Sequence, residues 1–212
     1  MSTNLGPGDP LATTPDPVSP WNIANYLTVL RLLLVPVFLF ALLAEDGAST
    51  GWRVTAAAVF LLAGYTDRVD GQIARSRGLV TSFGKLADPM ADKALTGAAF
   101  IGLSVLGELA WWITLLVLAR ELGITLLRFF VIRHGVMPAS RGGKLKTVLQ
   151  GVAIVLYVLP LTGLLASGRA VVMAAAVLVT VATGADYVLR ALTLRKTSDR
   201  AAMKRARKAD RA

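Results

Sequence analysis

The sequence predicts an all-α integral membrane protein with six transmembrane helices and both termini in the cytoplasm. Hydrophobic residues occupy 55% of the 212 positions, whereas soluble domains are typically about 45–50% apolar. The excess lies in windows of roughly 20 residues with few charges, the length that a helix needs to cross the hydrocarbon core of a bilayer. Basic residues are concentrated in alternate connections, and this alternation indicates an orientation.

Six windows of this kind follow one another: residues 26–44, 52–70, 86–106, 111–132, 147–166 and 170–193. Pro36 inside the first window is expected to kink it. We expect short extracellular links at EDGAST (45–50) and LASGRA (165–170). The longer segment 133–146 is expected to be a cytoplasmic connection, with irregular backbone at its paired glycines.

The windows are expected to form one domain between two polar ends. Residues 1–20 contain no Lys or Arg and are rich in Pro, Gly, Ser and Thr, which predicts a disordered leader. Residues 21–194 hold the six spans, and residues 195–212 form a basic cytoplasmic tail. The tail could bind RNA, but anionic lipid headgroups are the simpler partner for a membrane protein, and no nucleic acid is expected. The absence of cysteine excludes disulfides and thiolate sites.

The net charge of +10 is distributed unevenly along the chain. Segments 67–93 and 133–146 and the C-terminal tail carry most of the lysine and arginine, and the other connections carry few. By the positive-inside rule, these segments and both termini face the cytoplasm. We therefore expect a multi-pass protein of the plasma membrane, with its charged segments at the inner surface.

Residues 67–93, DRVDGQIARSRGLVTSFGKLADPMADK, place four aspartates between two apolar windows. Charges near a bilayer core cost on the order of 2.5–3.5 kcal/mol each by insertion scales, so they usually mark a functional site. Asp67 and Asp70 are spaced i, i+3 and share a helix face, which Gly71 and Ala74 continue. A second set recurs every four residues on the next helix: Gly84, Asp88 and Asp92.

Four carboxylates in one place would repel one another strongly unless cations neutralised them. Hard oxygen ligands in this number suit Mg²⁺ or Mn²⁺, and the charge is sufficient for two ions. A two-metal carboxylate site usually acts on phosphate groups. Small residues on the same face leave room for a bulky ligand, and Arg75 can reach a diphosphate. The residues favour a nucleotide diphosphate at the inner membrane surface, and the alternative is that the aspartates are solvated loop charges.

The pattern D-x2-D-G-x2-A-R-x8-G-x3-D-x3-D is complete here and resembles the signature of the CDP-alcohol phosphatidyltransferases. Its fixed positions are Asp67, Asp70, Gly71, Ala74, Arg75, Gly84, Asp88 and Asp92. The resemblance implies a six-helix fold, a homodimer and an active site open to the cytoplasm. It also implies that all four aspartates bind metal and that Asp92 is the general base for the acceptor's hydroxyl.

The resemblance implies further residues that bind the substrate CDP-diacylglycerol. Those in the charged segment are Gly71, Ala74, Arg75, Thr81 and Gly84. Those that open the first span and would close over the same ligand are Asn25, Tyr26, Leu27 and Thr28.

Two other stretches, NIANYLTVLRLLLVPVF and MPASRGGKLKT, resemble the phosphatidylglycerophosphate synthases of this family, particularly the actinobacterial type. These enzymes transfer a phosphatidyl group from CDP-diacylglycerol to sn-glycerol 3-phosphate and release CMP. The same reaction with inositol 1-phosphate or phosphatidylglycerol as acceptor remains an alternative. A cation transporter is a more distant one, because transport would favour carboxylates near the midplane and internal repeats.

A phosphorylated acceptor requires cations near the metals. Arg120 lies eight residues before Arg128, and about 800° of helical rotation puts both on nearly the same face. Lys144 and Lys146 begin the fifth span from the same side. We expect these four residues to bind the acceptor's phosphate. Glu121, beside Arg120, leaves open that this arginine belongs to a buried ion pair.

Other features are expected to be structural. Four glycines inside the windows are expected to let helices approach closely: Gly97, Gly102, Gly123 and Gly151. Asp186 and Arg190, spaced i, i+4 near the inner end of the sixth window, are expected to form an ion pair within the helix.

Overall fold

The computed structural model describes residues 23–76, 82–131 and 141–209, with the backbone alone at some helix ends. These residues contain no strand and form α1 (Ile23–Leu43), η1 (Ala44–Gly47), α2 (Thr50–Ser76), α3 (Ser82–Val105), α4 (Trp111–Val131), α5 (Arg141–Val158) and α6 (Gly163–Ala209). The all-helical fold is thereby confirmed for the described part of the chain. The expected leader lies outside the described residues. The expected tail begins within α6, which continues without a break to Ala209.

Both ends of α5 and the start of α6 differ from those expected. α5 ends at Val158, and the segment 165–170, expected to be a link, forms the first turns of α6. The link is 159–162 instead, because Pro160 lacks the N–H that a helix needs and disfavours helical backbone in the residue before it. At its other end α5 begins at Arg141, so the paired glycines lie in the first helical turn rather than in irregular backbone. Glycine is about 0.8–1.0 kcal/mol less favourable than alanine inside a helix, a cost that the packing of the rest of α5 can outweigh.

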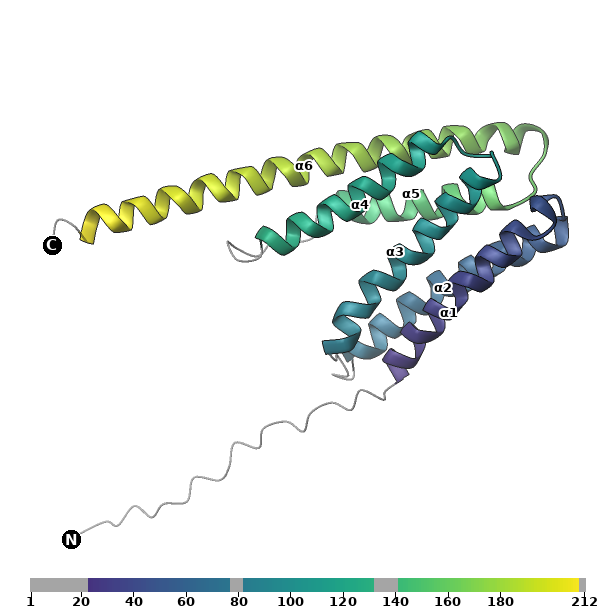
Figure 1. Ribbon diagram of the computed structural model, residues 1–212, viewed down its shortest axis with the longest axis horizontal. Helices are drawn as coiled ribbons and strands as arrows, with labels where there is room; N and C mark the ends of the chain where they lie inside the picture. Colours follow the sequence, from purple (N-terminus) through teal and green to yellow (C-terminus); the bar gives the residue numbers. More distant parts are fainter. Residues whose placement is uncertain (1–22, 77–81, 132–140, 210–212) are drawn as a thin grey trace, which may run out of the picture.

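The helix connections alternate between the two ends of the molecule. In Figure 1 the α1–α2, α3–α4 and α5–α6 connections gather at one end, on the right. The end of α2, the start of α3, the end of α4 and the start of α5 lie toward the other end. α1, α2 and α3 pack as one group and α4, α5 and α6 as a second, and α2 and α3 make the contacts between the groups. The helix ends that flank both charged connections therefore lie on one side.

A stripe of α2 packs against α1 in the first group. Ala56, Phe60 and Ala63 recur at helical spacing and are buried. The ring centroids of Phe60 and Phe38, in α1, lie 5.7 Å apart. The alanines on either side of Phe60 allow the two helix backbones to approach closely.

The expected role of the glycines is confirmed at two of the four positions. A Cβ added at Gly102 would lie 2.6 Å from Leu42 Cδ2 in α1, and one at Gly97 would lie 3.3 Å from a leucine of α4. α3 therefore approaches its neighbours closely at these points. At Gly123 and Gly151 an added Cβ would meet no described atom within 4 Å, so the expectation is wrong there.

Two of the described helices contain a segment long and apolar enough to cross a membrane. These segments are Tyr26–Gly47 and Gly163–Ala191, with mean hydropathies of 2.5 and 2.0. α4 carries charge inside its apolar stretch, at Arg120 and Glu121, and such charges lower the mean hydropathy of a window. All six helices nevertheless expose large apolar side chains that do not line the cavity described below, for example Leu33, Leu62, Ile101, Leu115, Leu145 and Leu178.

Arg53, near the start of α2, links α2 to α5 and to the α3–α4 connection at the end of the molecule where the three connections gather. Its side chain is 4% exposed, and it donates hydrogen bonds of 2.8 and 2.7 Å to the carbonyl oxygens of Val158 and Tyr157. Carbonyls at the end of a helix lack helical partners, so this arginine caps α5. Arg53 also pairs with Glu108 in the α3–α4 connection at 2.7 Å, and Arg169 of α6 reaches the same glutamate at 3.4 Å.

Candidate active site

The expected signature lies on two helices at the end opposite Arg53. Asp67, Asp70, Gly71, Ala74 and Arg75 are in α2, and Gly84, Asp88 and Asp92 are in α3. Figure 1 shows the end of α2 and the start of α3 at this same end of the molecule. Of these residues, only Asp67 has a side chain within the described part of the structure. Only the backbone of the other seven is described, and all of Thr81 lies outside the described residues.

Asp67 is paired with an arginine from α1. Nη1 of Arg31 lies 2.7 Å from Oδ1 of Asp67. The arginine side chain is 1% exposed and the aspartate side chain 40% exposed, so the pair runs from the interior to an open edge. A buried charge is tolerated when an opposite charge compensates it, and Arg31 therefore restrains the position of Asp67. Arg31 was not expected as a site residue from the sequence, although an arginine inside an expected span signals a functional site.

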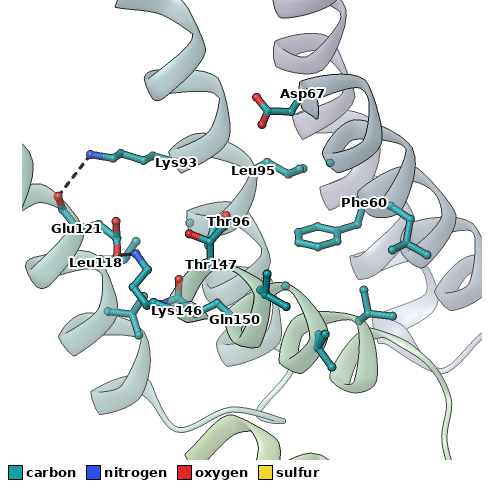
Figure 2. Close-up of a pocket in the computed structure, with 18 of the residues that line it drawn as sticks. Phe60, Asp67, Lys93, Leu95, Thr96, Leu118, Glu121, Lys146, Thr147 and Gln150 are labelled. Atoms are coloured by element: carbon teal, nitrogen blue, oxygen red, sulfur yellow. Dashed lines mark hydrogen bonds and ion pairs between the residues drawn. The ribbon is translucent and has the colours of Figure 1, made fainter. Parts of the chain in front are cut away.

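A cavity of about 720 Å³ lies between α2, α3, α4 and α5. Each helix contributes one charged lining residue, and Figure 2 shows all four: Asp67, Lys93, Glu121 and Lys146. Its uncharged polar lining includes Thr96, Thr147 and Gln150. Most of the remaining lining is apolar, with Phe60 and Leu95 among the residues drawn in Figure 2. A cavity with a charged part and an apolar part suits an amphipathic ligand.

Glu121 is the centre of a polar network at this cavity. Its carboxylate oxygen Oε1 accepts a hydrogen bond from Nζ of Lys146 and lies 3.1 Å from Nη1 of Arg120. Its main-chain carbonyl accepts hydrogen bonds from Oγ1 of Thr125 at 2.8 Å and from Nζ of Lys93 at 3.5 Å, the latter dashed in Figure 2. Lys93 also donates to the hydroxyl of Thr125. The network thus joins α3, α4 and α5.

Arg120 extends the network to α6. Its Nη2 donates a hydrogen bond of 2.9 Å to Oγ1 of Thr183. Its stem lies against Gly184, where an added Cβ would be 3.2 Å from Cγ of the arginine. The ion pair between Arg120 and Glu121, which the sequence offered as an alternative, is therefore present, and Arg120 does not line the cavity.

In α6, the expected ion pair between Asp186 and Arg190 is confirmed, because Nε of Arg190 lies 2.9 Å from both carboxylate oxygens of Asp186.

The four cations expected to bind the acceptor's phosphate occupy different surroundings. Lys146 lines the cavity and is 7% exposed, whereas Lys144 is exposed and does not line it. Two residues apart on a helix means a rotation of about 200°, which explains the difference. Arg120 and Lys146 share one oxygen of Glu121, so the structure brings these two together. The side chain of Arg128 lies outside the described residues.

The four residues expected to close over the nucleotide lie in the first turns of α1. Thr28 is buried, Leu27 is half-buried and Tyr26 is exposed. None of these three lines the cavity. The side chain of Asn25 lies outside the described residues.

Three residues of the network were not expected from the sequence: Lys93, Thr125 and Thr183. Lys93 follows the last aspartate of the signature, so its position was available as a signal. The threonines lie in apolar windows and each bonds a carbonyl of its own helix, at 2.8 Å for Thr125 and 2.7 Å for Thr183. Because such internal bonds are common for threonine in helices, the pattern alone does not reveal that these hydroxyls also contact a neighbouring helix.

The described side chains contain no group of three or more histidine, cysteine, aspartate or glutamate residues that could hold a metal ion. Asp67 is the single expected metal ligand among them. Its carboxylate is the kind of oxygen donor that Mg²⁺ and Mn²⁺ prefer, and it lies at the cavity on the helix that also carries Asp70. The residue therefore fits the metal chemistry expected from the sequence.

Most of this chain is similar in sequence to known proteins. Residues 21–182, which include the signature and all of the cavity lining, match the family model for CDP-alcohol phosphatidyltransferase. A probable phosphatidylglycerophosphate synthase of Mycobacterium tuberculosis is 60% identical over 171 residues, which cover 81% of this chain and 82% of that protein. A CDP-diacylglycerol–glycerol-3-phosphate 3-phosphatidyltransferase of Bacillus subtilis is 33% identical, over 84% of this chain and 100% of that protein. A CMP-forming cardiolipin synthase of Streptomyces coelicolor is 35% identical over 55% of this chain and 54% of that protein.

The match thus extends through five of the six helices and part of the last one. It covers both helices of the signature and every helix that lines the cavity. The chain belongs to the CDP-alcohol phosphatidyltransferase family.

Proposed function

We propose that this chain transfers the phosphatidyl group of CDP-diacylglycerol to sn-glycerol 3-phosphate. The acceptor's primary hydroxyl attacks the lipid-linked phosphorus, and the bond from that phosphorus to the oxygen of CMP breaks. CMP leaves with the bonding electrons, and the lipid product is phosphatidylglycerophosphate. The names of the Mycobacterium tuberculosis and Bacillus subtilis relatives support this assignment.

The observation that carries the proposal is the composition of the cavity. It joins Asp67, a residue of the signature, to Lys93 and Lys146, and it continues between apolar side chains. A lipid-linked diphosphate and a phosphorylated acceptor need all three elements: carboxylates for metal ions, cations for phosphate and an apolar surface for the lipid. Holding both substrates in one cavity removes much of the entropic barrier to their reaction.

The proposal gives each signature residue a role. Two Mg²⁺ or Mn²⁺ ions would be held by Asp67, Asp70, Asp88 and Asp92. When bound, such ions polarise phosphoryl oxygens and stabilise charge on the leaving group. Asp92 also takes the proton from the acceptor's hydroxyl. The nucleotide portion of CDP-diacylglycerol would be bound by Gly71, Ala74, Arg75, Thr81 and Gly84, with Asn25, Tyr26, Leu27 and Thr28 closing over it.

The acceptor's phosphate is proposed to lie beside the Glu121 network. Its proposed ligands are Arg120, Arg128, Lys144 and Lys146. Lys146 has the strongest support, because it lines the cavity and shares a carboxylate oxygen of Glu121 with Arg120. A phosphate monoester carries more charge than the diester of phosphatidylglycerol, so a cluster of cations favours a phosphorylated acceptor. Inositol 1-phosphate would satisfy the same cations and is included in the test below.

The protein is proposed to cross the plasma membrane six times as a homodimer, with the cavity open to the cytoplasm. Support for spans beyond the two apolar segments comes from large apolar side chains exposed on every helix. Soluble monomers rarely expose contiguous apolar patches of more than a few hundred Å². The basic tail would then meet anionic headgroups at the inner surface.

The first test is CMP release by the purified protein in detergent, with CDP-diacylglycerol and Mg²⁺. Glycerol 3-phosphate, inositol 1-phosphate and phosphatidylglycerol are offered as separate acceptors. We expect turnover with glycerol 3-phosphate alone. The variant Asp92→Asn should reduce kcat by about 10²–10⁴-fold, the usual contribution of a general base, and by more if a metal ion is also lost.

The outcomes separate the chemistry from the acceptor. Turnover with inositol 1-phosphate or phosphatidylglycerol instead would retain the phosphatidyl transfer and refute the choice of acceptor. No CMP with any of the three, from a folded preparation, would refute the proposed reaction. Full activity of Asp92→Asn would remove that residue from the mechanism.

A further inference from the structure

We propose that Glu121 is a positioning residue that assembles an anion site from three helices, and that Lys93 is a phosphate-binding member of that site. The ligand is a phosphate monoester, which the proposed function identifies as the phosphate of the acceptor. The inference rests on that function for the ligand's identity. It assigns roles to two residues outside the family signature.

The first step is the sharing of one carboxylate oxygen. Oε1 of Glu121 contacts both Nη1 of Arg120, its neighbour on α4, and Nζ of Lys146 on α5. All three side chains are largely buried, at 17%, 13% and 8% exposed. Lysine carries its charge on a flexible four-carbon stem, so a fixed partner is needed to hold the ammonium in one place. Glu121 supplies that partner at the cavity.

The second step is the position of Lys93. Its ammonium contacts the main-chain carbonyl of Glu121 and the hydroxyl of Thr125. Figure 2 shows its side chain extending from α3 across the cavity toward α4, on the same side as Lys146. Lys93 is also the residue directly after Asp92 in the chain. Lys93 therefore holds a cation of α3 at the part of the cavity where Glu121 contacts Lys146 of α5.

The third step is the geometry that results. Side chains from α3, α4 and α5 converge on one residue, so their amino and guanidinium groups are gathered before any ligand arrives. Binding to a preassembled site avoids the cost of ordering long side chains, which is about 0.5–1.5 kcal/mol for each. Glu121 therefore increases the affinity of the site for the phosphate without contacting the phosphate itself. Thr183 and Gly184 of α6 restrain the arginine from the other side.

The test compares Glu121→Gln with Glu108→Gln. Glu108 is a matched control, because its side chain is only 24% exposed and is also shared by two cations, Arg53 and Arg169, but it lies in the α3–α4 connection at the opposite end of the molecule. We expect Glu121→Gln to raise the KM for glycerol 3-phosphate at least about tenfold, since misplacement by about 1 Å can cost on the order of 100-fold. The KM for CDP-diacylglycerol should stay within about twofold. Glu108→Gln should change neither KM, and Glu121→Asp should recover part of the loss.

Lys93→Met should raise the same KM in the same selective way. A double-mutant cycle between Glu121→Gln and Lys146→Met separates positioning from direct contact. If Glu121 acts partly through Lys146, the loss in the double variant is smaller than the sum of the two single losses, so the effects are not additive. The thermal unfolding midpoint, measured for every variant, identifies those whose kinetics reflect loss of folding, and Glu121→Asp then carries the test.

Four results would overturn the inference. A rise confined to the KM for CDP-diacylglycerol would assign the cluster to the nucleotide's diphosphate. A fall in the KM for glycerol 3-phosphate would mean that Glu121 repels the acceptor. Additive effects would make Glu121 independent of Lys146, and loss of stability with unchanged KM values would leave it a structural residue. Failure of the proposed function is visible separately, because the unaltered protein would then release no CMP with glycerol 3-phosphate.

Discussion

At the scale of single residues, the contact between Arg31 and Asp67 links a buried charge to the proposed metal site. Lysine would keep that charge but lose the planar, forked geometry of the guanidinium. We therefore expect Arg31→Lys to leave Asp67 poorly oriented. The Mg²⁺ concentration for half-maximal CMP release should rise about tenfold, as is typical when a partner behind a metal ligand is changed. Mn²⁺ binding, measured by electron paramagnetic resonance, should weaken by a similar factor.

Arg190→Lys is the control, because Arg190 also pairs with an aspartate but is exposed on α6. It should leave Mn²⁺ binding unchanged. Equal Mn²⁺ affinity in Arg31→Lys and the unaltered protein would mean that this arginine does not orient a metal ligand.

A site residue can be predicted from the sequence where a regular spacing reveals it, but not where only a tertiary contact does. The aspartates repeat at helical intervals, so their two helices followed from the sequence. The sequence predicts that Arg120 and Lys146 bind the same phosphate. It offers Glu121 only as an alternative partner of Arg120, so it does not reveal that this carboxylate contacts both cations. Arg31 is an isolated charge in an apolar window, and its partner lies 36 positions later, which no local pattern encodes.

At the scale of elements, the close contact of α3 with α1 depends on Gly102. Adding a methyl group there would place it 2.6 Å from Cδ2 of Leu42, which is fully buried, so this side chain would have to shift within the core. We expect Gly102→Ala to destabilise the protein by about 1–3 kcal/mol through overpacking. The measurement is the midpoint of thermal unfolding in detergent.

Gly123→Ala is the matched comparison within α4. A Cβ there meets no described atom within 4 Å, so the higher helix propensity of alanine should leave the protein unchanged or stabilise it by up to about 1 kcal/mol. Opposite signs for the two variants would confirm that the contact, rather than glycine itself, determines stability. A shift of the same sign and size would contradict this.

The element boundaries show where hydropathy misleads. The apolar run continues past Val158, which predicts a fifth span that ends too late and a sixth that begins too late. Pro160 marked the true end of α5, because proline interrupts a helix irrespective of how apolar its neighbours are. The number and order of the helices came from the apolar windows, whereas their ends depended on backbone chemistry.

At the scale of the whole molecule, the proposed topology can be tested directly, because the chain contains no cysteine. Ala48 and Gln72 are exposed and lie near opposite ends of α2, a helix outside the two most apolar segments. We expect a membrane-impermeant maleimide to label Ala48→Cys in intact cells. Gln72→Cys should be labelled only after the membrane is opened.

Labelling of both positions in intact cells would contradict a membrane-crossing α2. Labelling of Gln72→Cys alone would reverse the proposed orientation. The unaltered protein provides the background, since it has no thiol to react.

The contacts of Arg53 hold the two groups of helices together at one end of the molecule. Two three-helix groups meet at the end of the molecule where this arginine joins α2, the α3–α4 connection and the last carbonyls of α5. Ion pairs and hydrogen bonds at a largely buried residue resist displacement more than those in water. A rotation of one group against the other would therefore pivot near Arg53. Such a rotation would move the helix ends at the opposite end of the molecule, where Asp67 lies, further than the helix ends beside Arg53.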